Sequence, residues 1–224
     1  MGSARKHGEA AVKTGLRRAA AAAVNFLIAV ITLWCWIAIL AAVTDMGSPL
    51  MAGGLYSLKF FTTLSNLFNG AACAATSIVL MLGRTPSQGL RTWKLAGTSA
   101  VGLTFLTVMV FLGPVFGYGG MFLGTNFWYH LALPVISMVS FVTLERDTPL
   151  PFRKTFLAVV PMLLYSAGYL GNVLIQGPGE WPDKHDFYGF LLWGWPIGIA
   201  IACALVVLIW VLAVVLRRLN GKTK

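Results

Sequence analysis

The residues of this sequence that could carry chemistry are polar side chains inside otherwise apolar segments. One such segment runs from Phe60 to Gly70. On a helix at about 100° per residue, its polar positions fall within an arc of about 160°. These positions are Thr62, Thr63, Ser65, Asn66, Asn69 and Gly70. One of the three histidines, His130, lies in a similar apolar segment, where desolvation favours the neutral imidazole that can accept a proton. A threonine hydroxyl beside such a base could attack an acyl carbon.

Two further polar stripes follow the same helical spacing. Asn126 lies four residues before His130, and Tyr165, Tyr169 and Asn172 are spaced by four and three. At a rise of about 1.5 Å per residue, the hydroxyl and the imidazole each lie roughly 8–12 Å below the outer surface, a level that Tyr169 and Asn172 also reach. The expected substrate contacts or oxyanion donors are Asn66, Asn69, Asn126, Tyr165, Tyr169 and Asn172. On spacing alone, these side chains could equally serve as hydrogen bonds between helices.

The elements that position these residues follow from the composition. Of the 224 residues, 58% are hydrophobic and 11% are charged, and the mean hydropathy is +0.78. A soluble domain carries about a quarter of charged residues, so this composition excludes a soluble catalytic head. We predict an all-α polytopic membrane protein with six transmembrane helices of ~20 residues or more. The expected spans are 19–43, 58–83, 95–117, 123–144, 155–176 and 187–216.

The lysines and arginines predict the orientation of the helices. The N-terminal segment 1–18 has five, the loops after the second and fourth spans have three each, and the C-terminal end has four, together 15 of the 17. Because such residues accumulate in cytoplasmic loops, both termini are expected in the cytoplasm. The six-helix domain, 19–217, then lies between two basic segments, 1–18 and 218–224. We expect these segments to contact anionic lipids rather than nucleic acid. The Ala-, Gly- and Val-rich composition favours a bacterial inner membrane.

Two short motifs resemble a known family. Phe61, Thr63 and Asn66 match its second helix, and His130 with Pro134 matches its fourth. The sequence resembles, over most of its length, the androgen-induced-gene family, which includes the androgen-dependent TFPI-regulating protein and bacterial six-helix relatives. The resemblance implies an intramembrane threonine hydrolase of fatty-acid esters of hydroxy fatty acids, with Thr63 as nucleophile and His130 as base.

The resemblance leaves one choice of nucleophile and one choice of function open. Thr62 is adjacent to Thr63, and a shift of one residue would turn the hydroxyl by about 100° around the helix. We expect a lipid ester to enter from the bilayer and a dyad to act without metal or cofactor, since no carboxylate partner for His130 is evident inside a span. The alternative function is a transporter or a lipid-binding scaffold with a polar cavity near the outer surface.

Other polar groups have plainer expected roles. We expect the acids and the histidine of segment 177–186 to form a solvated turn, because no regular spacing of metal ligands is present. Glu145, with the two charged residues after it, is expected to be a solvated ion cluster. Pro134, Pro161 and Pro196 are expected to kink helices. The cysteines are expected to be small buried apolar residues.

Overall fold

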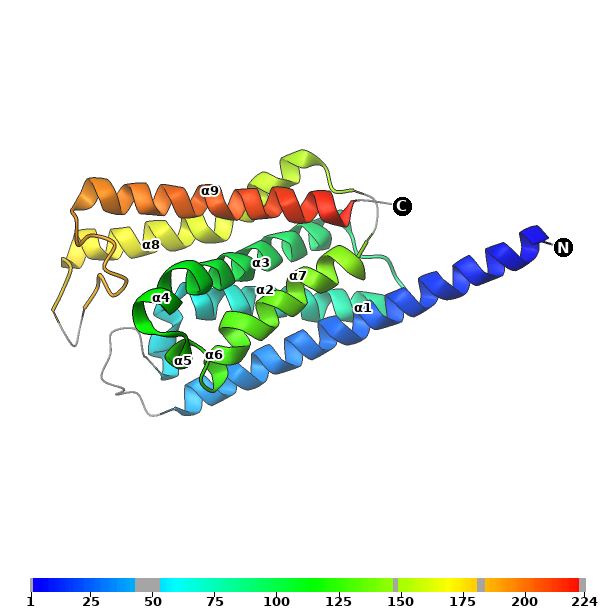
Figure 1. Cartoon of the computed structure of the whole chain (residues 1–224), viewed down its shortest axis with the longest axis horizontal. Coiled ribbons are helices and arrows are strands. Elements are labelled where there is room, and N and C mark those ends of the chain that lie inside the picture. Colours follow the sequence, from blue (N-terminus) through cyan, green and yellow to red (C-terminus); the bar gives the residue numbers. More distant parts are fainter. Residues whose placement is uncertain (1, 43–52, 147–148, 181–183, 222–224) are drawn as a thin grey trace.

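The computed structural model describes residues 2–42, 53–146, 149–180 and 184–221 of the chain, and all regular structure in these ranges is helical. The helical segments lie side by side along one direction (Figure 1). Their bounds in chain order are α1 Gly2–Ala41, η1 Gly54–Lys59, α2 Phe61–Met81, α3 Gln88–Thr107, η2 Val108–Leu112, α4 Gly113–Phe116, α5 Tyr118–Met121, α6 Thr125–Phe127, η3 Trp128–Ala132, α7 Leu133–Thr143, η4 Phe152–Val159, α8 Val160–Gln176 and α9 Trp195–Asn220.

Five helices of the described chain are long and apolar enough to cross a membrane. They are Val12–Ala41, Phe61–Met81, Gln88–Leu112, Phe152–Gln176 and Trp195–Asn220. The prediction of an all-α polytopic membrane protein is therefore confirmed. The expected fourth span, 123–144, coincides with the run from α6 through η3 to α7, which is not among the five. That run contains Asn126, His130 and Pro134, which lower its hydropathy.

Two span boundaries differ from the prediction for reasons visible in the sequence. The third span begins at Gln88 rather than at residue 95, because the Ser87 side chain caps the helix by accepting from the Leu90 backbone N–H at 3.2 Å. The sixth helix begins at Trp195 rather than at residue 187. Gly189 and Gly194, with φ of 69° and 86°, place turns in the segment before it.

Prolines shape the helices at two kinds of position. η2 and η3 are π-helical turns, and each precedes a helix whose second residue is proline, Pro114 or Pro134. A proline ring clashes with the carbonyl four residues earlier, and a π-turn removes this clash by shifting the hydrogen bonds to i→i−5. Accordingly, the Leu133 backbone N–H donates to the Trp128 oxygen. Pro196 lies in the first turn of α9, so the expectation that it kinks a helix is wrong for this residue, whereas Pro161 lies within the span Phe152–Gln176, where the 3-10 helix η4 changes to α8.

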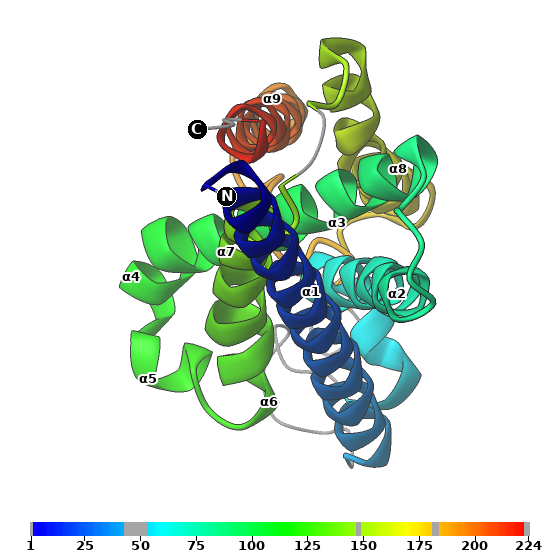
Figure 2. The same ribbon diagram turned by 90° about the vertical axis from the view of Figure 1, so that its right-hand side faces the viewer.

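The bundle is organised around α3. Its buried residues include most positions from Thr92 to Thr104. α2, α7, α9 and η4 pack around it, and α1 packs on the outer side of α2 and α7 (Figure 2). The N-terminal part of α1 extends beyond the bundle (Figure 1). The central place of α3 explains why the polar residues in its middle, such as Lys94, Thr98 and Ser99, are buried.

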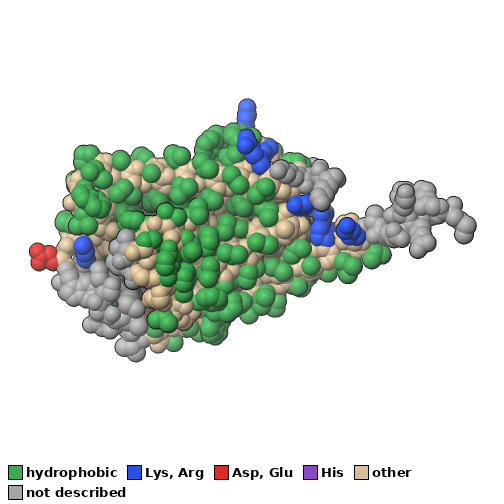
Figure 3. Space-filling model, in the orientation of Figure 1, with side chains coloured by type: hydrophobic (Ala, Val, Ile, Leu, Met, Phe, Trp, Pro, Cys, Tyr) green, Lys and Arg blue, Asp and Glu red, His purple; other side chains and the backbone are tan. Residues whose placement is uncertain are grey.

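The surface fits a bilayer. Large apolar side chains such as Phe26, Leu33, Trp34, Leu164 and Val207 are exposed along the helices. In the face shown in Figure 3, lysines and arginines gather at the end where both termini lie, and the acidic side chains lie at the opposite end. We call the first end the basic end and the other the acidic end. This distribution agrees with the charge pattern from which the orientation was predicted.

Candidate functional site

His130 is held in one tautomer by the turn in which it lies. Its side chain is 8% exposed, and its Nδ1 atom lies 2.8 Å from the backbone oxygen of Met121. A carbonyl oxygen can only accept, so Nδ1 carries the hydrogen, and Nε2 of the neutral ring then holds the lone pair. A backbone carbonyl thus orients the imidazole as a carboxylate does in a catalytic triad. This arrangement suits Nε2 for accepting a proton.

The two adjacent threonines of α2 face different neighbours. Thr63 is buried at 4% exposure on the side of α2 that also carries Asn66. Asn66 donates from Nδ2 to the backbone oxygen of Tyr129, the residue before His130, at 3.1 Å. Thr62 instead lines a small cavity of 50 Å³ beside α3 and η2. Thr63 does not line this cavity, and no hydrogen bond joins it to His130 within the described residues.

The orientation of the Asn66 amide is fixed by its partners. Nδ2 donates to the backbone oxygens of Thr62, at 2.9 Å, and Tyr129, at 3.1 Å. Since carbonyl oxygens only accept, the nitrogen must occupy this position and both of its hydrogens are used. Asn66 therefore has no free N–H for an oxyanion, which was one of its two expected roles. Its Oδ1 is buried without a hydrogen-bond partner among the described residues, so this acceptor remains available to a substrate or a water molecule.

The other two expected asparagines, Asn69 on α2 and Asn126 in α6, lie on different helices and have different partners. Asn69 donates from Nδ2 to the Ser137 hydroxyl on α7 at 2.8 Å, so it joins two helices. Asn126 is half-buried in α6, and its side chain has no hydrogen-bond partner in the ranges that the structure describes. Four residues separate it from His130, which places the two on neighbouring turns of the same helical run. Asn126 is thus the expected oxyanion donor whose amide hydrogens remain available.

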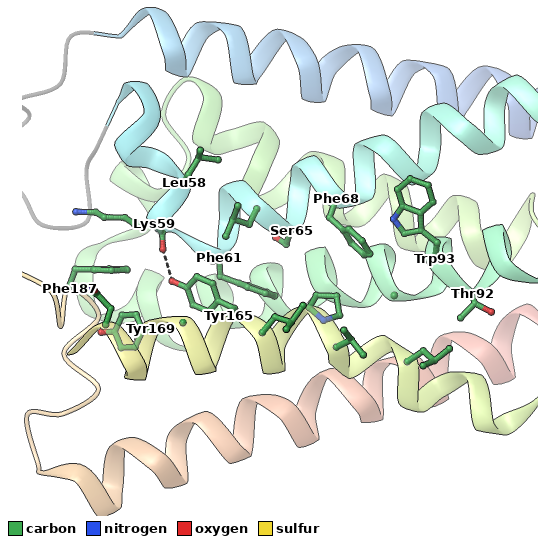
Figure 4. A pocket seen from close by; sticks show the side chains of 18 of the residues that line it. Leu58, Lys59, Phe61, Ser65, Phe68, Thr92, Trp93, Tyr165, Tyr169 and Phe187 are labelled. Carbon is green, nitrogen blue, oxygen red and sulfur yellow. Dashed lines mark hydrogen bonds between the residues drawn. The ribbon is translucent and has the colours of Figure 1, made fainter. Parts of the chain in front are cut away.

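The other expected contacts lie in a separate groove. Tyr165, Tyr169 and Asn172 line a cavity of 940 Å³ between α2, α3 and α8, to which α2 contributes Leu64 and Phe68 from the side away from η3 (Figure 4). Neither Thr63 nor His130 lines it. The three polar stripes therefore do not meet in one chamber. The stripe of α8 lies on another side of α2 than Asn66 and η3, and we call this cavity the α8 groove.

The polar groups of the α8 groove gather at its acidic end. The Tyr165 hydroxyl donates to the Lys59 backbone oxygen at 2.7 Å (Figure 4). The Tyr169 hydroxyl donates to Asp186 Oδ1 at 2.5 Å. Asn172 accepts from Gln176 through Oδ1 at 3.0 Å. The Lys59 ammonium lies 5.0 Å from the Phe187 ring centroid, and its partial burial lowers its pKa. Most of the remaining wall is apolar or aromatic and extends to Thr92 and Trp93 near the basic end.

The segment after α8 is more ordered than a solvated turn. Asp186 is 2% exposed, and besides Tyr169 it accepts from the backbone N–H groups of Phe190 and Leu191 at 2.9 and 3.1 Å. The expectation of a solvated turn is therefore wrong for Asp186, while residues 181–183 lie outside the described part of the chain. In that described part, no group of three or more His, Cys, Asp or Glu side chains could hold a metal ion.

A buried ionic cluster near the basic end is not evident from the sequence. Lys94 is 2% exposed on α3, and its Nζ donates to Cys73 Sγ on α2 at 2.8 Å and lies 3.6 Å from Glu145 Oε1. Glu145 Oε1 also accepts from Asn25 Nδ2, at 2.9 Å, and from the Ser140 hydroxyl, at 3.1 Å. The cluster ties α1, α2 and α3 to the end of α7.

The expectation that Glu145 belongs to a solvated cluster is therefore wrong. Hydropathy places Lys94 in a loop because the apolar run begins after it, whereas the helical start at Gln88 turns it into the bundle. The available signal was the N-cap at Ser87, which predicts helix from Gln88 onward. Of the cysteines, Cys35 and Cys73 are buried as expected, whereas Cys203 is exposed.

Searches with the sequence and the structure found no matching family model, curated protein or solved structure.

Proposed function

We propose that the protein is an intramembrane lipid ester hydrolase in which Thr63 is the nucleophile and His130 is the general base. The observation that carries the proposal is the Met121 carbonyl on Nδ1 of His130, which leaves the Nε2 lone pair free on a buried ring. The burial of Thr63 one turn from Asn66, which donates to Tyr129, the residue before His130, supports it further. The resemblance to the androgen-induced-gene family selects the same two residues.

The proposed reaction begins with a lipid ester whose carbonyl carbon meets Oγ1 of Thr63. Nε2 of His130 takes the hydroxyl proton as Oγ1 bonds to the carbon, and the negative oxygen of the tetrahedral intermediate accepts a hydrogen bond from the Asn126 amide. The bond to the leaving alkoxide breaks, and His130 returns the proton to it, which releases the alcohol and leaves an acyl-threonine. Water then attacks this ester with His130 acting again as base, and the fatty acid and free Thr63 are formed.

Asn66 has an acceptor role in this scheme. Its N–H bond to Tyr129 joins α2 to η3, its other N–H bond goes to Thr62 within α2, and its buried Oδ1 can accept a hydrogen bond from the attacking water. Asn66 is one turn from Thr63, which is the distance at which such a water would lie between them. The ester is proposed to enter from the bilayer, and the α8 groove is not part of this route, since neither Thr63 nor His130 lines it.

The proposal is tested with purified full-length protein and two esters, one fluorogenic of medium chain length and one a branched fatty-acid ester. Thr63→Ala and His130→Ala are expected to lower kcat by at least about 10³-fold, because each removes a group that acts in the transition state. Thr62→Ala is the matched control and is expected to retain activity. Equal hydrolysis by wild-type protein and both variants would refute the proposal.

A covalent probe identifies the nucleophile independently. A fluorophosphonate is expected to modify Thr63, so that mass spectrometry of the segment from Phe61 to Phe68 shows one added phosphonyl group. The labelling should be lost in Thr63→Ala and kept in Thr62→Ala. Labelling that moves to Thr62 would change the register, and labelling of neither residue, with folded and active protein, would place the nucleophile elsewhere.

A second candidate function is lipid binding, which the α8 groove favours. With 940 Å³ and a mainly apolar wall, it is of the size at which proteins enclose lipid-like ligands. Gly168 lines it, and a Cβ added there would have nothing within 4 Å, so Gly168→Leu places an apolar side chain at the groove. Gly171 on the same helix has equal space but does not line the groove. Loss of co-purifying lipid in Gly168→Leu but not in Gly171→Leu would support this function.

A further inference from the structure

A second cavity lies at the basic end, between α1, α2, α3 and the end of α7. Its volume is 190 Å³, several times the ~30 Å³ that one water molecule occupies in the liquid. The positively charged residues of its wall are Arg17, Arg18, Arg91, Lys94 and Arg146, and its negatively charged residue is Glu145. Positively charged residues therefore outnumber negatively charged ones among the described residues of this wall.

The one negatively charged residue among the described residues of this wall, Glu145, already has partners. Glu145 Oε1 lies 3.6 Å from Lys94 Nζ and accepts from Asn25 and Ser140, so it balances the charge of Lys94 at the floor of the cavity. The guanidinium groups of Arg17, Arg18 and Arg146 then border the cavity, and its described lining residues include no second carboxylate. Like charges around one cavity repel one another, and the repulsion increases where protein displaces water.

The fold holds these arginines in place from separate elements. Arg18 donates from Nη2 to the backbone oxygen of Arg84 at 2.9 Å, which joins α1 to the loop before α3. Arg146 donates from Nε to the backbone oxygen of Val142 at 2.7 Å, which fixes its stem at the end of α7. Arg17 Nε is buried without a hydrogen-bond partner among the described residues. A buried, unpaired guanidinium N–H is costly unless an acceptor reaches it.

We propose that this cavity binds a phosphate group. A phosphate oxygen accepts from Arg17 Nε, and the planar guanidinium groups match phosphate oxygens in pairs. A phosphate also neutralises part of the excess positive charge of the wall. The cavity lies at the end where positively charged residues meet the membrane surface, where basic pockets between helices take phospholipid headgroups. The phosphate source is therefore a phospholipid headgroup or a soluble phosphate compound, and the experiment separates the two.

The test uses full-length protein in nanodiscs of phosphatidylcholine, alone or with phosphatidylglycerol, and inorganic phosphate as the soluble probe. The variant Arg17→Gln with Arg146→Gln removes two guanidinium groups from the wall. The matched control is Arg153→Gln with Arg218→Gln, which removes two exposed arginines at the same end that do not line the cavity. The readouts are lipid retained in native mass spectrometry and the shift of the thermal unfolding midpoint with added phosphate.

In wild-type protein we expect retention of phosphatidylglycerol, a rise in midpoint with phosphate, or both. Binding to the cavity variant should be at least about tenfold weaker, as expected for two lost charge-assisted hydrogen bonds, and binding to the control should be unchanged. A response to the lipid alone identifies a headgroup site, and a response to phosphate alone identifies a soluble ligand.

Two results would overturn the proposal. One is an equal response of the wild-type protein and the cavity variant to both probes, and the other is an equal loss of binding in the control. If the cavity variant does not fold, Arg17→Lys with Arg146→Lys keeps both charges but loses the paired donors. It should then bind phosphate more weakly than wild-type protein, with an unchanged midpoint in the absence of the probe. All these readouts are independent of ester hydrolysis, so a failure of the phosphate proposal can be distinguished from a failure of the proposed hydrolase.

Discussion

The two sides of α2 differ sharply in packing although one helix supplies both. Toward α1 and α3, the approach is so close that a Cβ on Gly70 would lie 2.7 Å from Cγ2 of Thr32, and one on Gly97 would lie 2.9 Å from Cα of Asn69. Toward α8, the apolar side chains of α2 border a groove of 940 Å³. Small and polar residues therefore make the tight contacts of this bundle. Large apolar side chains gain little by leaving lipid for another helix, so they can leave a gap that lipid fills.

The largest effect is expected on the tightly packed side of α2, near the basic end, where Cys73 contacts Lys94. Glu145→Ala leaves the Lys94 ammonium buried without its carboxylate, and we expect a loss of about 3–5 kcal/mol of stability. The measurement is unfolding of the full-length protein in mixed micelles. Combining Glu145→Ala with Lys94→Met should recover much of the loss, since no buried charge then remains. Wild-type stability of the single variant would contradict the ionic cluster.

This ionic cluster also marks the limit of what the sequence predicts. Apolar runs located the helices because each span must satisfy its own backbone in lipid, and α2 and η4 with α8 fall close to the expected spans. The starts of α3 and α9 were not predicted, since hydropathy does not register a cap at Ser87 or the turns at Gly189 and Gly194. A charged residue near a span end can lie in a loop or in the bundle, and hydropathy treats both alike.

The polar side of each helix could be predicted from the sequence, but the way in which these sides face one another could not. The spacing of Thr63, Asn66 and Asn69 correctly predicted one polar, buried side of α2. It could not predict that the polar stripe of α8 would face the opposite side of α2, because each helix is free to rotate about its axis until tertiary contacts fix it. The carbonyl partner of His130 was equally hidden, since Met121 is brought back to the ring only by the turns before η3.

Two glycine-to-alanine substitutions compare the packing on the tight side of α2 with that on the groove side. Gly97→Ala is expected to cost about 1–3 kcal/mol, because the new methyl group would meet the backbone of Asn69. Gly168→Ala on the groove side meets nothing within 4 Å and should stabilise α8 by up to about 1 kcal/mol through helix propensity. Unfolding in mixed micelles measures both. The same sign for the two variants would mean that the sides do not differ in packing.

An asparagine pair sharpens the comparison with function. Asn66→Ala removes the two donors that join Thr62 and Tyr129, so we expect a loss of about 1–2 kcal/mol together with slower release of the acyl group. The kinetic part appears as a burst of alcohol followed by slow turnover. Asn172→Ala, at the α8 groove, should change neither quantity measurably, since its side chain bonds to the exposed Gln176. Unchanged kinetics in Asn66→Ala, with intact Thr63 activity, would exclude the role of Asn66 in hydrolysis.

The smallest effect is expected from removing a single hydroxyl on each side. Tyr129→Phe leaves the backbone oxygen of Thr32 without its donor at 3.0 Å in a buried contact, whereas Tyr165→Phe frees the Lys59 oxygen at the end of the groove. Water can reach the second acceptor more easily, because its hydrogen bond is only partly buried, whereas the bond between Tyr129 and Thr32 is fully buried. We therefore expect a loss below about 1 kcal/mol for Tyr165→Phe and a larger one for Tyr129→Phe. Hydrogen exchange of the neighbouring backbone amides resolves differences of this size. A larger acceleration of exchange near Lys59 in Tyr165→Phe than near Thr32 in Tyr129→Phe would reverse the assignment of the loose and tight sides.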